Sequence, residues 1–271
     1  MGHWTLQDIP WDKFDCAKVE PGILCLVKAA SLVEQNGADY ARYLCGVFAG
    51  DALFIGAAQR WGAEEIQHGA ALGRWARLAD PNFDHAEACA RFTAGFRVDL
   101  DARLSVRGSR ARELVARCIV EIGTSSYYTA LAEASEEPVL RAICRHIAAD
   151  EIRHYKLFRT HLERYLEAER LGFWGRLAVA IGRIRESEDD ELAFAYHAAN
   201  AQAATYDRAS AIRAYARRAY RVYRRHHVER GVMMVLKAVG LRPNGRLGRI
   251  ATAVAWRGMR WRLARLERAA A

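Results

Sequence analysis

The sequence lacks paired cysteines. No two of its six cysteines form a Cys-x-x-Cys pair; they are Cys16, Cys25, Cys45, Cys89, Cys118 and Cys144. A rubredoxin centre and a zinc ribbon both need closely spaced thiolates, so neither is encoded. We interpret the cysteines as small buried apolar residues in a reducing compartment.

Long apolar runs are also missing. No stretch of eighteen apolar residues occurs, and the first residues do not have the pattern of a signal peptide. The sequence therefore predicts no membrane-spanning helix and favours a cytoplasmic location. Association with the periphery of a membrane is left open.

Proline is scarce, and no proline interrupts the long helical patterns. The five prolines and the glycine-containing turns leave helices over about 23–49, 52–79, 109–134 and 138–170. The connection between the second and third helices is partly helical near 86–96. Further helices are predicted over about 173–199, 203–239 and 246–269, and no strand-like alternation of any length appears. The sequence predicts an all-α protein.

Acidic residues are depleted toward the C-terminal end. Residues 205–271 hold 17 basic and 3 acidic side chains, a net charge of +14, whereas residues 1–204 hold 24 basic and 29 acidic ones, a net charge of −5. Such a basic region attracts anionic partners. An anionic membrane surface and an acidic carrier protein are both open, whereas nucleic acid is disfavoured because no base-reading motif accompanies the arginines.

A Glu-x-x-His phrase occurs twice in the predicted helices. The first contains Glu65 and His68, and the second contains Glu151 and His154. Residues three apart lie on the same face of a helix, so each phrase directs a carboxylate and an imidazole to one point. Each phrase is therefore half of a candidate dinuclear metal site.

Each phrase also follows a glutamate about thirty residues upstream. Glu34 precedes Glu65 by 31 residues, and Glu121 precedes Glu151 by 30. At a rise of ~1.5 Å per residue, the chain runs up one helix and returns to the same level on the next. Two such hairpins would bring together four carboxylates and two imidazoles, a donor set suited to a pair of iron ions. The predicted ligands are Glu34, Glu65, His68, Glu121, Glu151 and His154.

This duplicated pattern resembles the ferritin-like di-iron carboxylate superfamily, which includes rubrerythrins, soluble acyl carrier protein desaturases and ribonucleotide reductase small subunits. The resemblance implies a four-helix bundle over residues 22–170, made of two antiparallel hairpins with a long crossover. Residues 171–271 would form a helical C-terminal extension that is strongly basic from 205. By the same resemblance, Glu64 and Asp150 would each hydrogen-bond a ligand histidine. Gln67 stands where the second copy has Arg153, which predicts unequal surroundings for the two histidines.

The predicted function is that of an oxygen-activating di-iron oxidoreductase, an oxidase or oxygenase acting on an organic, apolar substrate. Two Fe ions would be bridged by Glu65 and Glu151 or by a subset of the carboxylates, with a Mn/Fe pair left open. An external electron donor is expected because no rubredoxin centre is encoded. One alternative is a ferroxidase or peroxidase that handles iron or peroxide without an organic substrate. A second is a non-catalytic, metal-stabilised bundle with a cationic docking tail, and a homodimer also stays open.

Other tyrosines and histidines are interpreted as packing residues. Tyr40 and Tyr127 each follow a predicted ligand glutamate by six residues, about 240° in rotation from the ligand face. Tyr155 is ambiguous because it adjoins His154. A packing or surface role is favoured for the remaining histidines of interest, which are His146, His161, His226 and His227.

Overall fold

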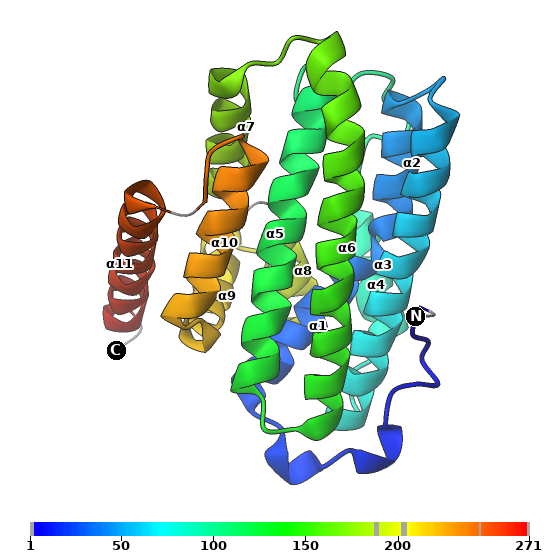
Figure 1. The fold of residues 1–271 in the computed structure, drawn as a ribbon. Helices are drawn as coiled ribbons and strands as arrows, with labels where there is room; N and C mark the ends of the chain where they lie inside the picture. Colours follow the sequence, from blue (N-terminus) through cyan, green and yellow to red (C-terminus); the bar gives the residue numbers. More distant parts are fainter. Residues whose placement is uncertain (1–2, 187–189, 202–204, 244, 270–271) are drawn as a thin grey trace.

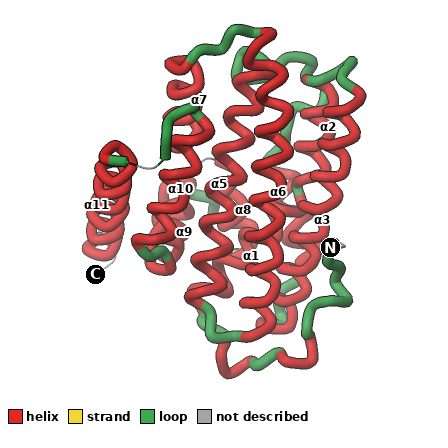
Figure 2. Tube along the Cα trace, in the orientation of Figure 1, coloured by secondary structure: helices red, strands yellow, loops and turns green. Residues whose placement is uncertain are grey.

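The fold is built from helices alone. The computed structural model describes residues 3–186, 190–201, 205–243 and 245–269. These residues form eleven α-helices and two short 3-10 helices, and no strand occurs among them (Figure 2). The all-α prediction is confirmed. None of the described helices is long and apolar enough to cross a membrane.

The central bundle is ferritin-like, as predicted. Helices α5 and α6 form an antiparallel hairpin, and α3 packs against α1 and α2 on the other side (Figure 1). The crossover between the two halves contains α4. The bounds of these helices are α1 Pro21–Gln35, α2 Gly37–Val47, α3 Ala52–Ala79, α4 His85–Gly95, α5 Arg110–Ala134 and α6 Pro138–Ala168.

Capping residues fix the starts of the bundle helices. Glu20 precedes Pro21 and accepts hydrogen bonds from the first backbone N–H groups of α1, and Glu137 does the same before Pro138 in α6. Proline suits the first helical position because its missing N–H would have no helical partner there. Asp51 and Ser109 cap α3 and α5 in the same way. Local sequence thus determines where each ligand-bearing helix begins.

The first predicted helix is broken. A single helix over 23–49 is wrong, because α1 ends at Gln35 and α2 begins at Gly37. The reason is a close approach to α3: a Cβ atom added to Gly37 would lie 2.3 Å from the Cβ of Glu65. Gly69 shows the same crowding, since its added Cβ would lie 2.7 Å from the backbone nitrogen of Gln35. The break therefore lies directly over the candidate site.

The C-terminal region also has more helices than predicted. The described residues of the predicted helix over 173–199 form two helices, and residues 187–189 between them lie outside the described residues. The predicted helix over 203–239 also forms two helices, and its residues 203 and 204 lie outside the described residues. Between α9 and α10 the backbone is extended at Tyr223 and Arg224. The side chain of His227 accepts the backbone N–H of Arg224 there and so caps α10. The observed helices are α7 Phe173–Arg185, α8 Asp190–Asn200, α9 Arg208–Val222, α10 Arg225–Ala238 and α11 Arg246–Arg268.

These added helices cover one side of the bundle. Helix α8 packs against α1, and both α7 and α10 pack against α5. Two apolar clusters fill the bundle on either side of the candidate ligands. One contains Trp75 and Leu131, and the other contains Phe54 and Phe158. The interpretation of all six cysteines as buried holds fully only for Cys118 and Cys144. Cys16 is exposed, the other three are partly buried, and all six are free thiols.

Candidate dinuclear metal centre

The structure brings all six predicted ligands to one level of the bundle. Glu34 lies in the last turn of α1, and Glu121 lies in the middle of α5. Helix α3 contributes Glu65 and His68, and α6 contributes Glu151 and His154. Every one of these residues is at most 8% exposed. The matched spacing in the sequence therefore places the six residues in the dry interior.

The six residues form two overlapping groups of four. Glu34, Glu65, His68 and Glu151 make one group, and Glu65, Glu121, Glu151 and His154 make the other. Within each group the candidate ligand atoms all lie within 4.8 Å of one another. Only Glu65 and Glu151 belong to both. Two adjacent cations would fit these groups, which have two carboxylates in common.

The distances between the histidine nitrogens and the glutamate oxygens are those expected for ligands of a common cation. Nδ1 of His68 lies 3.4 Å from Oε2 of Glu34 and 3.4 Å from Oε1 of Glu151. Nδ1 of His154 lies 3.0 Å from Oε1 of Glu65. A metal ion about 2.0–2.2 Å from each ligand atom separates neighbouring ligands by roughly these distances. Both imidazoles thus present the same nitrogen, Nδ1, to the carboxylates.

Each of the six side chains also has a buried polar atom without a hydrogen-bond partner. These atoms are Glu34 Oε2, Glu65 Oε1, His68 Nδ1, Glu121 Oε1, Glu151 Oε1 and His154 Nδ1. Burial of four carboxylates without compensation is prohibitively costly. All six unpartnered atoms lie on residues of the two groups of four, so divalent cations placed there would satisfy them together. The residues therefore fit a dinuclear metal cofactor.

The pKa values of the six residues also reflect the crowding of buried carboxylates in the absence of metal. Burial and the neighbouring carboxylates Glu65 and Glu151 raise the pKa values of Glu34 and Glu121 well above the usual range. Burial alone would lower the pKa of His154, but the surrounding carboxylates raise it well above its ordinary value. Without metal, protons therefore occupy part of the site.

Each histidine is held by an acid from the opposite hairpin. Nε2 of His68 lies 3.0 Å from Oδ2 of Asp150 in α6, and Nε2 of His154 lies 2.8 Å from Oε2 of Glu64 in α3. Because Nε2 faces these acids, Nδ1 is left to face the cluster. Burial by itself would raise the pKa of Asp150. Its hydrogen bonds with His68 and Arg153 have the larger effect and lower the pKa to about 2. Asp150 is therefore ionised at neutral pH.

The surroundings of the two acids are unequal, in line with the difference between Gln67 and Arg153. Arg153 donates to Asp150 and, at 3.0 Å, to Glu64. Gln67 instead donates to the backbone oxygen of Trp4 at 2.9 Å. One arginine thus links the two acids, whereas the glutamine fixes the N-terminal segment.

Trp4 is a site residue that the sequence reasoning missed. Its indole Nε1–H donates to Oδ2 of Asp150 at 2.7 Å, and its ring stacks parallel to His68 with centroids 6.0 Å apart. The ring also stacks with His146, with centroids 5.1 Å apart. Trp4 is buried, so the N-terminal segment covers the histidine side of the centre. No periodic pattern marks this segment in the sequence.

A comparison with family models supports this interpretation of the site. The model of the family described as fatty acid desaturase matches residues 49–173. The matched segment contains α3, α5 and α6, and hence every predicted ligand except Glu34. The chain belongs to the ferritin-like di-iron superfamily. Members of the matched family are oxidoreductases, and the chain is accordingly an oxidoreductase. No curated protein matches it.

Two further residues of the candidate centre lie on the ligand face of α5. Thr124 Oγ1 donates to Oε2 of Glu151 at 2.6 Å, and the hydroxyl of Tyr128 donates to Oε1 of Glu34. They follow Glu121 by three and seven residues, which is the helical spacing for one face. Thr124 follows Glu121 by three residues, as His68 follows Glu65, so the same spacing rule could have identified Thr124. Tyr127, one residue before Tyr128, lies off this face.

Hydrogen-bonded polar side chains connect the break between α1 and α2 with α8. Glu191 accepts from Asn36 Nδ2 at 3.0 Å and from the hydroxyl of Tyr40 at 2.7 Å. The guanidinium of Arg117 lies over the Tyr40 ring at 4.9 Å. Tyr40 therefore contributes to the structure around the break between α1 and α2. The C-terminal extension thus places a buried carboxylate close to the ligand helices.

The other residues that we interpreted as packing lie outside the two groups of four. His161 meets the edge of Phe54 at 5.1 Å. Tyr155 is buried in the apolar cluster that contains Phe158. His226 and His227 instead approach Glu133, at 3.0 and 3.1 Å. None of them is among the ligands of the described centre.

Proposed function

We propose that the chain is an oxygen-dependent di-iron oxidoreductase that acts on the acyl chain of a lipid. The observation that carries the proposal is the set of six buried ligands, each with an unpartnered atom, in a chain that matches the fatty acid desaturase model. Carboxylate oxygens with two imidazoles suit Fe(II) and also Mn(II). Bound iron would supply the redox chemistry and a position for oxygen, and the protein would supply geometry and a dry pocket.

For a desaturase, the proposed reaction removes hydrogen from two neighbouring methylene groups. Two C–H bonds break and one C=C bond forms, so the acyl chain loses two electrons and two protons. An external donor supplies two more electrons, and the solvent supplies two more protons. One oxygen molecule is thereby reduced to two molecules of water. The donor must be a separate protein or small molecule, because the sequence has no Cys-x-x-Cys centre of its own.

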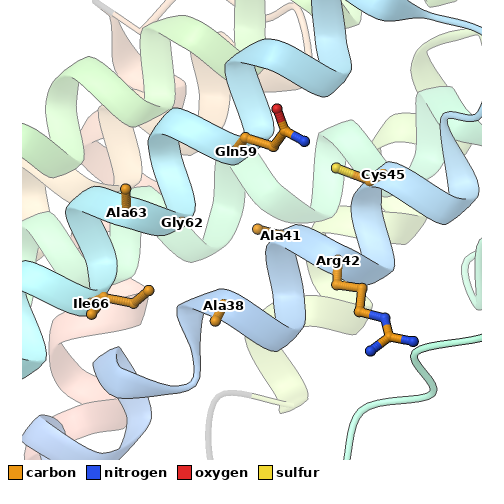
Figure 3. A pocket seen from close by; sticks show the side chains of 8 residues that line it. All are labelled: Ala38, Ala41, Arg42, Cys45, Gln59, Gly62, Ala63 and Ile66. Carbon is orange, nitrogen blue, oxygen red and sulfur yellow. The ribbon is translucent and has the colours of Figure 1, made fainter.

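An apolar groove lies near the site but does not reach it. The groove has a volume of about 380 Å³ and lies between α2 and α3 (Figure 3). It is lined by Ala38, Ala41, Arg42, Cys45, Gln59, Gly62, Ala63 and Ile66. No predicted ligand lines it, so the groove is not a substrate tunnel to the centre. The proposal of an acyl substrate therefore depends on the family match.

The decisive experiment follows oxygen and lipid together. The metal-free protein is loaded anaerobically with Fe(II), then supplied with oxygen, a chemical electron donor and a lipid extract. We expect two irons per chain, oxygen uptake, and acyl products that are two mass units lighter. The double variant Glu65→Ala/Glu151→Ala should lose all three, whereas Glu136→Ala/Glu163→Ala, which removes two exposed glutamates, should lose none.

Three outcomes would overturn the proposal in different ways. Rapid oxygen uptake with ferric product but unchanged lipids would favour an iron- or peroxide-handling protein. Retention of two irons by the Glu65→Ala/Glu151→Ala variant would show that the six residues are not the metal site. A protein that binds metal but never reacts with oxygen would support a metal-stabilised bundle without catalysis.

A further inference from the structure

Helix α11 lies on the outside of the molecule. It packs against α9 and α10 rather than against the four bundle helices, and it forms the outer edge of the fold in Figure 1. Its inner face buries Gly248, Thr252 and Leu263. These residues are four and eleven positions apart and so lie on one side of the helix. The opposite side is left for contacts beyond this chain.

That opposite side exposes large apolar residues. The exposed fractions are 52% for Leu247, 61% for Ile250, 66% for Val254 and 60% for Trp261. Their spacings of three, four and seven residues place them within about 60° of one another around the helix. Single exposed apolar residues are common on soluble proteins, whereas several gathered on one side of a helix mark a candidate binding surface. We call these four residues the outer stripe.

Arginines border the outer stripe. Helix α11 contains seven arginines, and the exposed Arg246, Arg249, Arg257 and Arg260 lie along one side of the stripe. The guanidinium of Arg265 lies 4.8 Å from the centre of the Trp261 ring. The helix has one acidic residue, Glu267, whose carboxylate is 3.0 Å from Arg221 of α9. Arg265 and Arg268 continue the line of the stripe in the last turn, so the outward surface is apolar as far as Trp261 and cationic at its edge and C-terminal end.

We propose that α11 binds in the plane of an anionic bilayer surface. The outer stripe enters the boundary between headgroups and acyl chains, and the flanking arginines contact lipid phosphates. This combination of an apolar stripe, flanking arginines and an interfacial tryptophan is what such helices require. Seven arginines in 23 residues prevent the helix from spanning the bilayer. The proposal does not depend on the proposed oxygen chemistry.

Other occupants fit this surface less well. A second copy of the chain would bring seven arginines of one α11 against seven of the other, and like charges repel. An acidic protein would match the arginines but would also need a rigid apolar socket for a convex row of four side chains. A bilayer offers both anionic groups and a deformable apolar phase. Charge and shape together therefore favour the membrane surface.

The test is co-sedimentation of the full-length, metal-loaded protein with vesicles. Phosphatidylglycerol–phosphatidylcholine vesicles are compared with pure phosphatidylcholine vesicles at low and at physiological salt. We expect binding to the anionic vesicles only, and a steep loss as salt screens the arginines over ~8 Å. The stripe variant Ile250→Asp/Val254→Asp and the charge variant Arg249→Glu/Arg257→Glu should each weaken binding roughly tenfold or more.

Matched controls separate this surface from general effects. Leu53→Asp/Leu104→Asp places the same two charges at exposed apolar residues outside α11 and should leave vesicle binding unchanged. Arg249→Lys/Arg257→Lys keeps the charge and should also bind. Metal content and helical circular dichroism should be equal in all variants, because none of these residues lies near the ligands.

Three results would overturn the proposal. The first is binding of anionic vesicles that the stripe variant does not weaken. The second is capture of an acidic carrier protein without any vesicle binding. The third is a concentration-dependent dimer that the stripe variant abolishes while vesicles remain unbound.

Discussion

Oδ2 of Asp150 lies 3.0 Å from Nε2 of His68, although the two residues belong to opposite hairpins of the bundle. The same crossed relationship joins Glu64 to His154 at 2.8 Å. Each acid therefore orients the imidazole that the other hairpin provides. The two halves of the repeat are interdependent, since neither hairpin carries both a histidine and the acid that orients it.

Loss of the Asp150 carboxylate should weaken metal binding. Asp150→Asn keeps the shape of the side chain but removes the charge that accepts from His68 and Arg153. We expect metal affinity to fall roughly 10- to 100-fold while the bundle stays folded. Titration of the metal-free protein with Co(II), followed by its visible absorption, measures the change. Glu64→Gln should act in the same direction through His154.

The control for this prediction is Asp84→Asn. Asp84 is an exposed aspartate at the start of α4, and its carboxylate accepts the backbone N–H of Glu87. Its replacement should leave the titration unchanged. Equal Co(II) affinity in Asp150→Asn and the wild type would show that Asp150 does not orient a metal ligand.

Trp4 should affect the metal affinity of the centre through the carboxylate of Asp150. Trp4→Phe removes the indole N–H that donates to Asp150 at 2.7 Å but keeps an aromatic ring against His68. We expect a loss of metal affinity smaller than that of Asp150→Asn, because His68 and Arg153 still hold the carboxylate. Trp4→Ala should lose more, since the ring packing disappears as well. An affinity order other than wild type, Trp4→Phe, Trp4→Ala would contradict this role.

Metal binding should release protons. In the metal-free site, neighbouring carboxylates raise the pKa of His68 well above its usual value despite burial, and burial raises that of Glu34. Protons therefore occupy ligand atoms at neutral pH, and a metal ion must displace them. Affinity should rise as pH rises. Calorimetric titrations in buffers of different ionisation enthalpy will count the released protons, and a binding enthalpy independent of the buffer would exclude this competition.

The sequence predicted the ligand set because the chemistry repeats at helical spacing. Glu65 with His68, and Glu151 with His154, are three residues apart, and helix geometry alone then places each pair on one face. Trp4 could not be predicted in this way, because its position depends on a nonperiodic segment that meets α6 only in the folded state. Its partner Asp150 is 146 residues away in sequence.

The break after Gln35 shows a second limit of the sequence. Residues 23–49 have a continuous helical pattern, and the local sequence does not reveal that α2 must approach α3 closely. That constraint comes from Glu65 on another helix, against which only glycine fits at position 37. Asn36-Gly37 is a common helix-ending pair, so a turn signal was present. The tertiary contact with α3, rather than local helix propensity, determines that the helix breaks at this pair.

Replacement of Gly37 provides the last prediction, because it tests whether this approach supports the centre. In Gly37→Ala the new Cβ would lie 2.3 Å from the Cβ of Glu65, so either α2 or the ligand must move. We expect a loss of stability of about 1–3 kcal/mol, as for other overpacked interiors, together with fewer than two metals per chain. Urea unfolding and metal analysis of the same preparation measure both effects. Gly123→Ala is the matched control, because its added Cβ meets nothing within 4 Å and α5 should gain about 0.5–1 kcal/mol from the change. If Gly37→Ala lost stability but kept two metals, the contact would serve packing alone and Glu65 would not depend on it for its position.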